Sequence, residues 1–154
     1  MDANRQNERL EDRRVKASAN LLDTARQALQ ALIPSKDEVS EMASSASRWL
    51  GLLHTMLPHP FTVRSQQEIV DRYESMCSPH VDAISVASWL LIIAITAQQV
   101  PGEHSNPGFQ SRRSQGWSRF SSAVSDTVET TIISHDRLIG TVQGLAMATH
   151  FIRL

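Results

Sequence analysis

The chain has 154 residues, of which 41% are hydrophobic and 20% are charged, and its formal net charge at pH 7 is -1. This length suits one domain and is short for two, and the composition is typical neither of a disordered chain nor of a membrane protein. The near-neutral charge excludes a global positive field that would attract nucleic acid. Cys77 is the only cysteine, which excludes an internal disulfide and a multi-cysteine zinc site built by this chain alone.

The first predicted element is a helix over residues 4–33, a stretch that lacks Gly and Pro. Its apolar side chains fall into two rows with a seven-residue spacing, which is the spacing of a coiled-coil seam. The predicted dimer seam consists of Val15, Leu22 and Leu29 in one row and of Ala25 and Leu32, which follow Ser18, in the other. Only about two and a half heptads are present, so an ordinary amphipathic helix that packs on its own domain is the alternative.

Two capping boxes predict the next helix starts. After Pro34, Ser35 and Glu38 have the spacing at which each side chain bonds the other residue's backbone N–H. Helical spacing of apolar residues then continues up to Pro58. Ser65 and Glu68 repeat the box and predict a short helix that ends near Ser78.

The most hydrophobic segment follows Pro79, which we place at the first position of a helix over residues 80–99. Its apolar run over residues 86–97 is shorter than the roughly 20 residues of a membrane span, so a buried, central helix is predicted.

Residues 101–116 are predicted as a loop, followed by one helix over residues 117–132 and a last one from Ser134 or Asp136. The sequence therefore predicts an all-α fold of five to six helices, divided into an N-terminal helical linker (1–33) and a helical domain (34–154).

Motifs for catalysis or metal binding are not found in the sequence. The six histidines show no His-x-x-x-His pair and no His-Glu-x-x-His motif. Cys77 has no neighbouring thiolate motif, and neither a Gly-x-Ser-x-Gly turn nor a Gly-rich phosphate loop occurs. Arg112, Arg113 and Arg119 are too few for the basic stripe of a DNA reader. We therefore expect a protein that is not an enzyme, needs no cofactor or metal, and makes no direct nucleic-acid or membrane contact.

The order of segments resembles the regulatory "middle homology" domain of fungal binuclear zinc-cluster transcription factors. The resemblance covers about residues 56–154. It rests on four segments: Leu57-Pro58-His59-Pro60-Phe61, Ile69-Val70-Asp71-Arg72-Tyr73-Glu74, the apolar helix from Ser88 to Ala97, and the helix from Asp136 to Met147. The family's six-cysteine DNA-binding cluster is absent from this sequence, and the family domain usually extends beyond Leu154.

The resemblance implies a transcription regulatory domain in the nucleus, truncated and without its own DNA-binding module. It also implies that residues 1–33 correspond to the linker and dimerisation segment of such proteins. The expected partners are proteins, namely a second copy of the chain or a full-length relative. The alternative is a small helical interaction or scaffold protein unrelated to transcription, for which a cytoplasmic location is expected.

Overall fold

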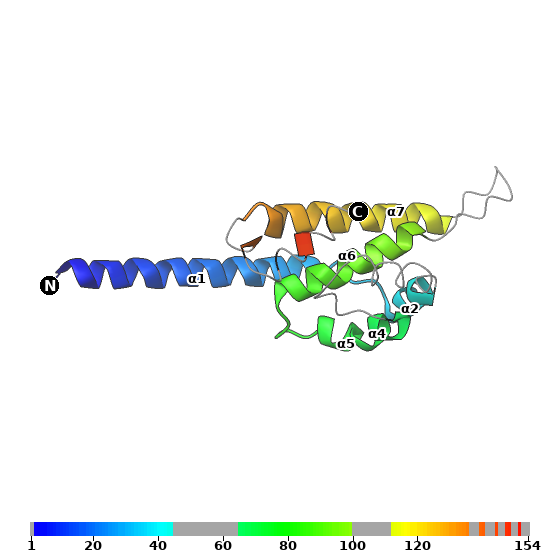
Figure 1. Cartoon of the computed structure of the whole chain (residues 1–154), viewed down its shortest axis with the longest axis horizontal. Coiled ribbons are helices and arrows are strands. Elements are labelled where there is room, and N and C mark those ends of the chain that lie inside the picture. Colours follow the sequence, from blue (N-terminus) through cyan, green and yellow to red (C-terminus); the bar gives the residue numbers. More distant parts are fainter. Residues whose placement is uncertain are drawn as a thin grey trace.

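The computed structural model describes a set of helices, and the described residues are 2–44, 65–99, 112–135, 139–140, 144, 147–148 and 151. The helices, labelled in Figure 1, are α1 (Asp2–Gln30), α2 (Lys36–Ser44), α4 (Gln66–Asp71), α5 (Tyr73–Met76), α6 (Ala83–Gln99) and α7 (Arg112–Val128), followed by the π-helical turn η1 (Glu129–Ile133). No strand occurs among the described residues, so the predicted all-α fold is confirmed. The helix predicted beyond Asp136 lies largely outside the described residues.

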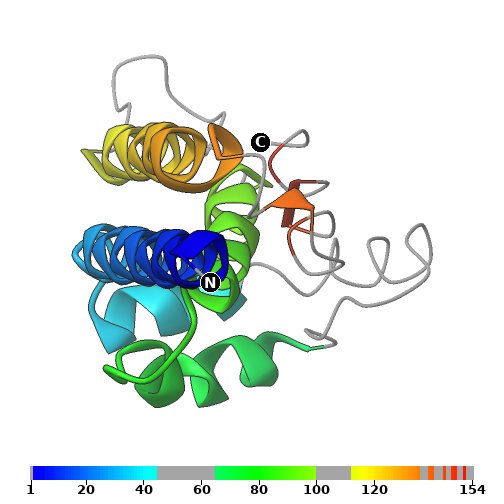
Figure 2. The same cartoon turned by 90° about the vertical axis from the view of Figure 1, so that its left-hand side faces the viewer.

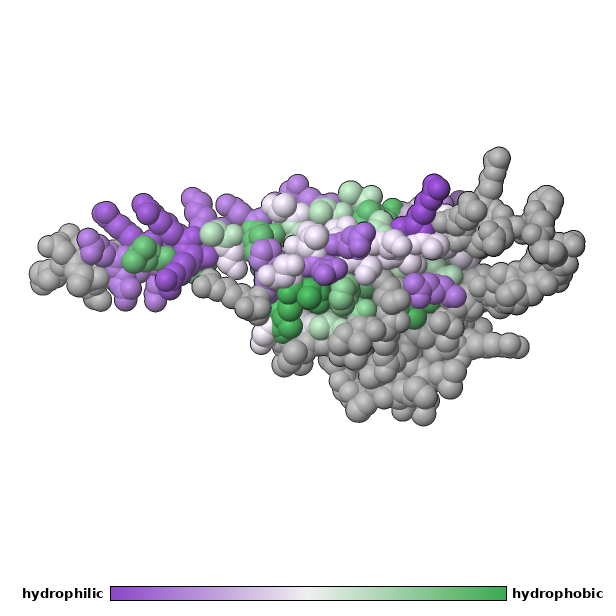
Figure 3. All heavy atoms as spheres, turned by 90° about the horizontal axis from the view of Figure 1, so that it is seen from above, coloured by the Kyte–Doolittle hydropathy of each residue, from purple (hydrophilic) through white to green (hydrophobic). Residues whose placement is uncertain are grey.

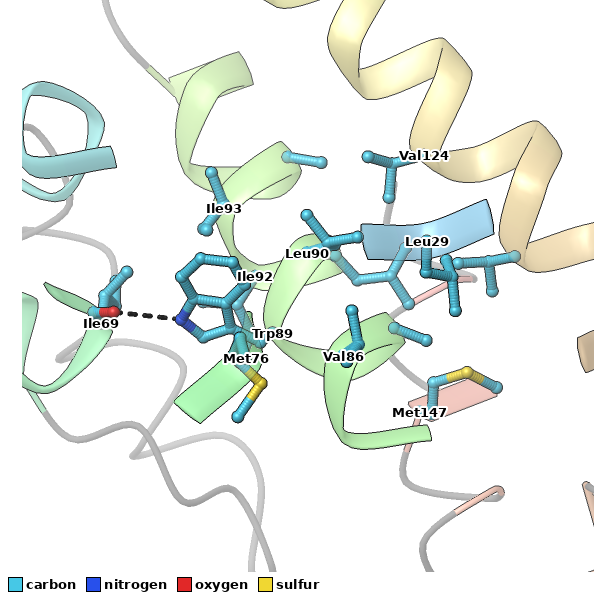
Figure 4. Packing of buried hydrophobic residues seen from close by; sticks show 14 of the residues in the cluster. Leu29, Ile69, Met76, Val86, Trp89, Leu90, Ile92, Ile93, Val124 and Met147 are labelled. Atoms are coloured by element: carbon cyan, nitrogen blue, oxygen red, sulfur yellow. Dashed lines mark hydrogen bonds between the residues drawn. The ribbon is translucent and has the colours of Figure 1, made fainter. Parts of the chain in front are cut away.

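The central element of the fold is α6, as its sequence predicts. Residues 89–97 are all buried, so no side of this stretch faces water, and a helix that is apolar all round is stable only when other elements surround it. Helices α1, α2, α5 and α7 pack against it. Figure 4 shows the resulting core, in which Leu29 of α1, Leu90 of α6 and Val124 of α7 come together.

Polar groups fix the helices on two sides of α6. The indole of Trp89 donates a hydrogen bond of 3.1 Å to the carbonyl of Ile69 in α4 (Figure 4). The ring of Tyr73 in α5 meets the Trp89 ring edge to face, with 6.2 Å between their centroids. On the α7 side, the hydroxyl of Ser121 donates to the carbonyl of Ala94 over 3.1 Å. These bonds satisfy polar groups that would otherwise be costly to bury.

Both predicted capping residues lie at helix starts. The backbone N–H of Ser35 donates to the Glu38 carboxylate over 2.9 Å, and the N–H of Glu38 donates to the Ser35 hydroxyl over 3.4 Å. The Ser65 hydroxyl accepts from the N–H of Glu68 over 3.2 Å. Hydrogen bonds from the Ser35 hydroxyl and backbone lower the pKa of Glu38 below its ordinary value. The first box is therefore reciprocal, as predicted.

Replacing Ser35 by alanine is expected to lower the free energy of unfolding by about 1 kcal/mol at pH 7, because the start of α2 loses its cap. The pKa of Glu38 is lower in the folded chain than in the unfolded one. Its stabilising contribution is therefore present above the unfolded-state pKa and is lost as the pH falls through the folded-state pKa. Denaturant titrations of both proteins at neutral and acidic pH test this: the difference between them should shrink in acid, and a constant difference would contradict it.

Two predicted boundaries are wrong. Helix α6 begins at Ala83 and not next to Pro79, because Asp82 caps it: its carboxylate accepts from the N–H of Ser85 over 2.8 Å. The predicted loop over residues 101–116 is too long, because α7 already begins at Arg112 and contains Gly116. A single glycine costs a helix interior about 1 kcal/mol relative to alanine, which neighbouring helix-forming residues can outweigh.

Replacing Gly116 by alanine is expected to raise the free energy of unfolding by about 0.5–1 kcal/mol. A Cβ atom at this position would have no atom within 4 Å, so the gain in helix propensity comes without a clash. Thermal unfolding of the two proteins measures the effect. A lower melting temperature for the variant would show that residue 116 is not helical.

Candidate interaction surface

Helix α1 has two halves with different surroundings. In its C-terminal half, Ala25 and Leu29 are 1% and 0% exposed and belong to the core. In its N-terminal half, residues 6–17 are all exposed, including Leu10 at 51% and Val15 at 70%. Figure 1 shows this half, in blue, extending away from the other helices, and Figure 2 views α1 end-on from its N-terminus. Figure 3 shows that its surface is mostly hydrophilic, with a few hydrophobic side chains.

The residues of the predicted dimer seam are divided between these two halves. Ala25 and Leu29 pack in the chain's own core, and Leu22 and Leu32 are partly buried against it. Only Val15 is exposed. The alternative of an amphipathic helix packed on its own domain therefore describes the C-terminal half of α1. Dimer formation stays a prediction, and in this structure Val15 is exposed and Leu22 and Leu32 are partly buried, whereas Ala25 and Leu29 are not accessible to another chain.

Long-range hydrogen bonds hold α1 in its direction. The Arg26 guanidinium donates to the carbonyl of Pro79 and pairs with Asp23. The Gln30 amide donates to the carbonyls of Met76 and Ser78, each over 2.8 Å. These bonds attach the C-terminal half of α1 to the end of α5 and to the turn that follows it. Because a helix advances about 1.5 Å per residue along one axis, the N-terminal half extends away from the core as long as it is helical.

The surface is hollowed at the point where the core stops covering α1. A shallow hollow of about 390 Å³ is lined by Arg14, Val15, Ser18, Ala19 and Leu22. Its lining combines two branched apolar side chains and two small ones with the long basic side chain of Arg14, and the small residues allow a second helix to approach closely. Sequence reasoning predicted Val15 and Leu22 for a contact surface but missed the hollow. The signal in the sequence is the pair of small residues, Ser18 and Ala19, between them.

A second polar cluster joins α2 to α5. The Lys36 ammonium bonds the Glu74 carboxylate over 2.9 Å and lies 5.9 Å from the centre of the Tyr73 ring. The Tyr73 hydroxyl donates to the carbonyl of Pro34 over 3.2 Å. The bond to Glu74 raises the pKa of Lys36, and burial raises the pKa of Tyr73. We interpret the cluster as a connection between helices, because its contacts join Pro34 and Lys36 to α5.

The remaining reactive side chains are scattered. His80 and Cys77 are exposed and His135 is partly buried, whereas His54, His59, His104 and His150 lie outside the described residues. Within the described ranges, no three His, Cys, Asp or Glu side chains gather where they could hold a metal ion. None of the helices in that part of the chain is long and apolar enough to cross a membrane. Comparisons of the chain with family models, curated proteins and solved structures found no match.

Proposed function

We propose that this chain is a non-catalytic helical regulatory module that binds a helix of another protein through the exposed half of α1. One observation carries the proposal: α1 continues as a helix over residues 2–20, beyond the part that the core buries. Most helical stability in proteins comes from the packing of an amphipathic face, and short isolated helices are only marginally stable in water. A partner helix would supply the packing that this half lacks.

The transcriptional part of the proposal is supported by the resemblance to zinc-cluster regulatory domains. Two of its segments fall on described helices: residues 69–74 on α4 and α5, and residues 88–97 on α6. In that family, a linker and dimerisation segment precedes the regulatory domain, and here α1 precedes the matching segments. The candidate partners are a second copy or a full-length relative in the nucleus. With one cysteine in its 154 residues, this chain would leave DNA contact to the partner.

A reporter assay in yeast tests the proposal. The full chain is fused to an unrelated DNA-binding domain, and reporter output is compared with that of the DNA-binding domain alone. The fusion is expected to change the output several-fold, and Val15→Glu is expected to abolish the change, because a carboxylate would enter the apolar contact. Asn20→Glu is the matched control, since Asn20 is also exposed but lies on the opposite side of the helix from Val15.

The outcomes separate the two candidate functions. Equal output from the fusion and from the DNA-binding domain alone would contradict a role in transcription. That result, together with a cytoplasmic location, would favour a helical scaffold protein, for which the same exposed half of α1 would be the binding surface. An unchanged output with Val15→Glu would instead show that the exposed half of α1 is not the contact.

A further inference from the structure

The two apolar rows of α1 continue toward its N-terminus with acidic residues. Seven residues before Val15 lies Glu8, and seven before Ser18 lies Glu11. Both glutamates are exposed. We call Glu8, Glu11, Val15, Ser18 and Leu22 the outer stripe of α1. Its part near the core carries Val15, Ser18 and Leu22 at the hollow, which Arg14 also lines, and its far part carries the two glutamates.

The acidic half of the outer stripe disfavours parallel pairing with a second copy. In a parallel, in-register coiled coil, each residue of a row meets the same residue of the other helix. Glu8 would then face Glu8 of the second copy, and Glu11 would face Glu11. Like charges taken out of water without a partner are costly, and such contacts act against an unwanted pairing.

Antiparallel pairing with a second copy also places the two carboxylates against unfavourable neighbours. There the residues of one row meet those of the other row, and Ala25 and Leu29 are unavailable because the core covers them. One register brings Glu8 against Glu11 of the second copy. The next brings Glu11 against Val15, and the third brings Glu11 against Leu22. In each of these three registers, a carboxylate within the two rows meets another carboxylate or an apolar side chain.

We infer that the outer stripe binds a basic amphipathic helix of a different protein, and not a second copy of this chain. The partner helix carries apolar side chains opposite Val15 and Leu22 and lysine or arginine opposite Glu8 and Glu11. This inference rests on the proposed function and specifies its partner: a full-length relative fits if it carries such a helix. The charged contacts are exposed, so they contribute more to the choice of partner than to affinity, and salt weakens them.

Two synthetic helical peptides test the inference against the full chain. Both carry three heptads with the same apolar seam; one has lysine at the two positions that face Glu8 and Glu11, and the other has glutamate there. Fluorescence anisotropy at low ionic strength is expected to show about tenfold tighter binding of the lysine peptide, equal to about 1.4 kcal/mol. Glu8→Lys/Glu11→Lys is expected to reverse the preference. Asp126→Lys/Glu129→Lys, which changes the net charge equally at exposed positions at the end of α7 and the start of η1, should preserve it.

Three results would overturn the inference. They are equal affinity for the two peptides, no binding of either peptide, and a wild-type dimer in sedimentation that Val15→Glu converts to a monomer. Circular dichroism of each variant verifies that these exposed substitutions leave the fold intact. The reporter assay decides the proposed function independently, since it measures transcription and requires no particular charge on the partner.

Discussion

Replacing Leu29 by alanine is expected to lower the free energy of unfolding by about 2–5 kcal/mol, the range for a buried leucine. Leu29 is fully buried and belongs to the same core cluster as α6. Val15 lies fourteen residues earlier in the same heptad row but is 70% exposed. Val15→Ala is therefore expected to change the stability by no more than about 0.5 kcal/mol. Urea titrations of the two variants measure the contrast.

The contrast distinguishes a core helix from a dimer seam. If the whole row formed a seam between two chains, both substitutions would destabilise, and the midpoint of unfolding would rise with protein concentration. The structure predicts a large, concentration-independent effect at Leu29 alone. Similar losses for the two variants would contradict the packing of α1 on its own core. Leu29 is buried in the chain's own core, so Leu29→Glu would place a carboxylate there and unfold the monomer. This variant therefore cannot test dimer formation.

Replacing Trp89 by alanine is expected to cost about 3–5 kcal/mol, because a large, fully packed side chain leaves a cavity in the centre of the core. Trp89 is 2% exposed and connects α6 to both α4 and α5. Trp89→Phe separates packing from hydrogen bonding: it keeps an aromatic ring but removes the donor to the buried carbonyl of Ile69. A cost of about 1–3 kcal/mol is expected for that variant.

Thermal unfolding measures the loss of stability in the Trp89 variants, and Tyr73→Phe is the reference variant for comparison. Tyr73 is partly buried at the edge of the Trp89 ring, and phenylalanine keeps this ring contact while losing the hydroxyl bond to Pro34. Its effect is expected to be the smaller one, about 1 kcal/mol. If Trp89→Ala proved as mild as Tyr73→Phe, α6 would not be the centre of the fold.

Local signals in the sequence were sufficient to predict most helices. The Ser35 and Ser65 caps and the apolar run of α6 act over a few residues, so they can be read without tertiary structure. The errors arose where two local signals compete. Pro79 and Asp82 can both begin a helix, and the carboxylate of Asp82 provides the hydrogen bond that proline cannot. Gly116 resembles a loop residue but lies inside α7.

The candidate surface could be predicted only in part, because a core stripe and a partner stripe have the same periodicity. The spacing of Val15, Leu22 and Leu29 is equal throughout, yet the chain's own helices cover one end and leave the other exposed. What decides the division is non-local: Arg26 and Gln30 bond the turn between α5 and α6, about fifty residues away. No pattern within α1 contains that information.

Hydrogen–deuterium exchange along α1 tests the central claim most directly. The claim is that the C-terminal half of this helix packs in the core and its N-terminal half binds a partner. In the chain alone, backbone amides of residues 21–30 are expected to be protected and those of residues 6–19 to exchange much faster. Adding the lysine peptide is expected to protect residues 8–22. Strong protection along the whole of α1 without the peptide, or no new protection with it, would contradict the account.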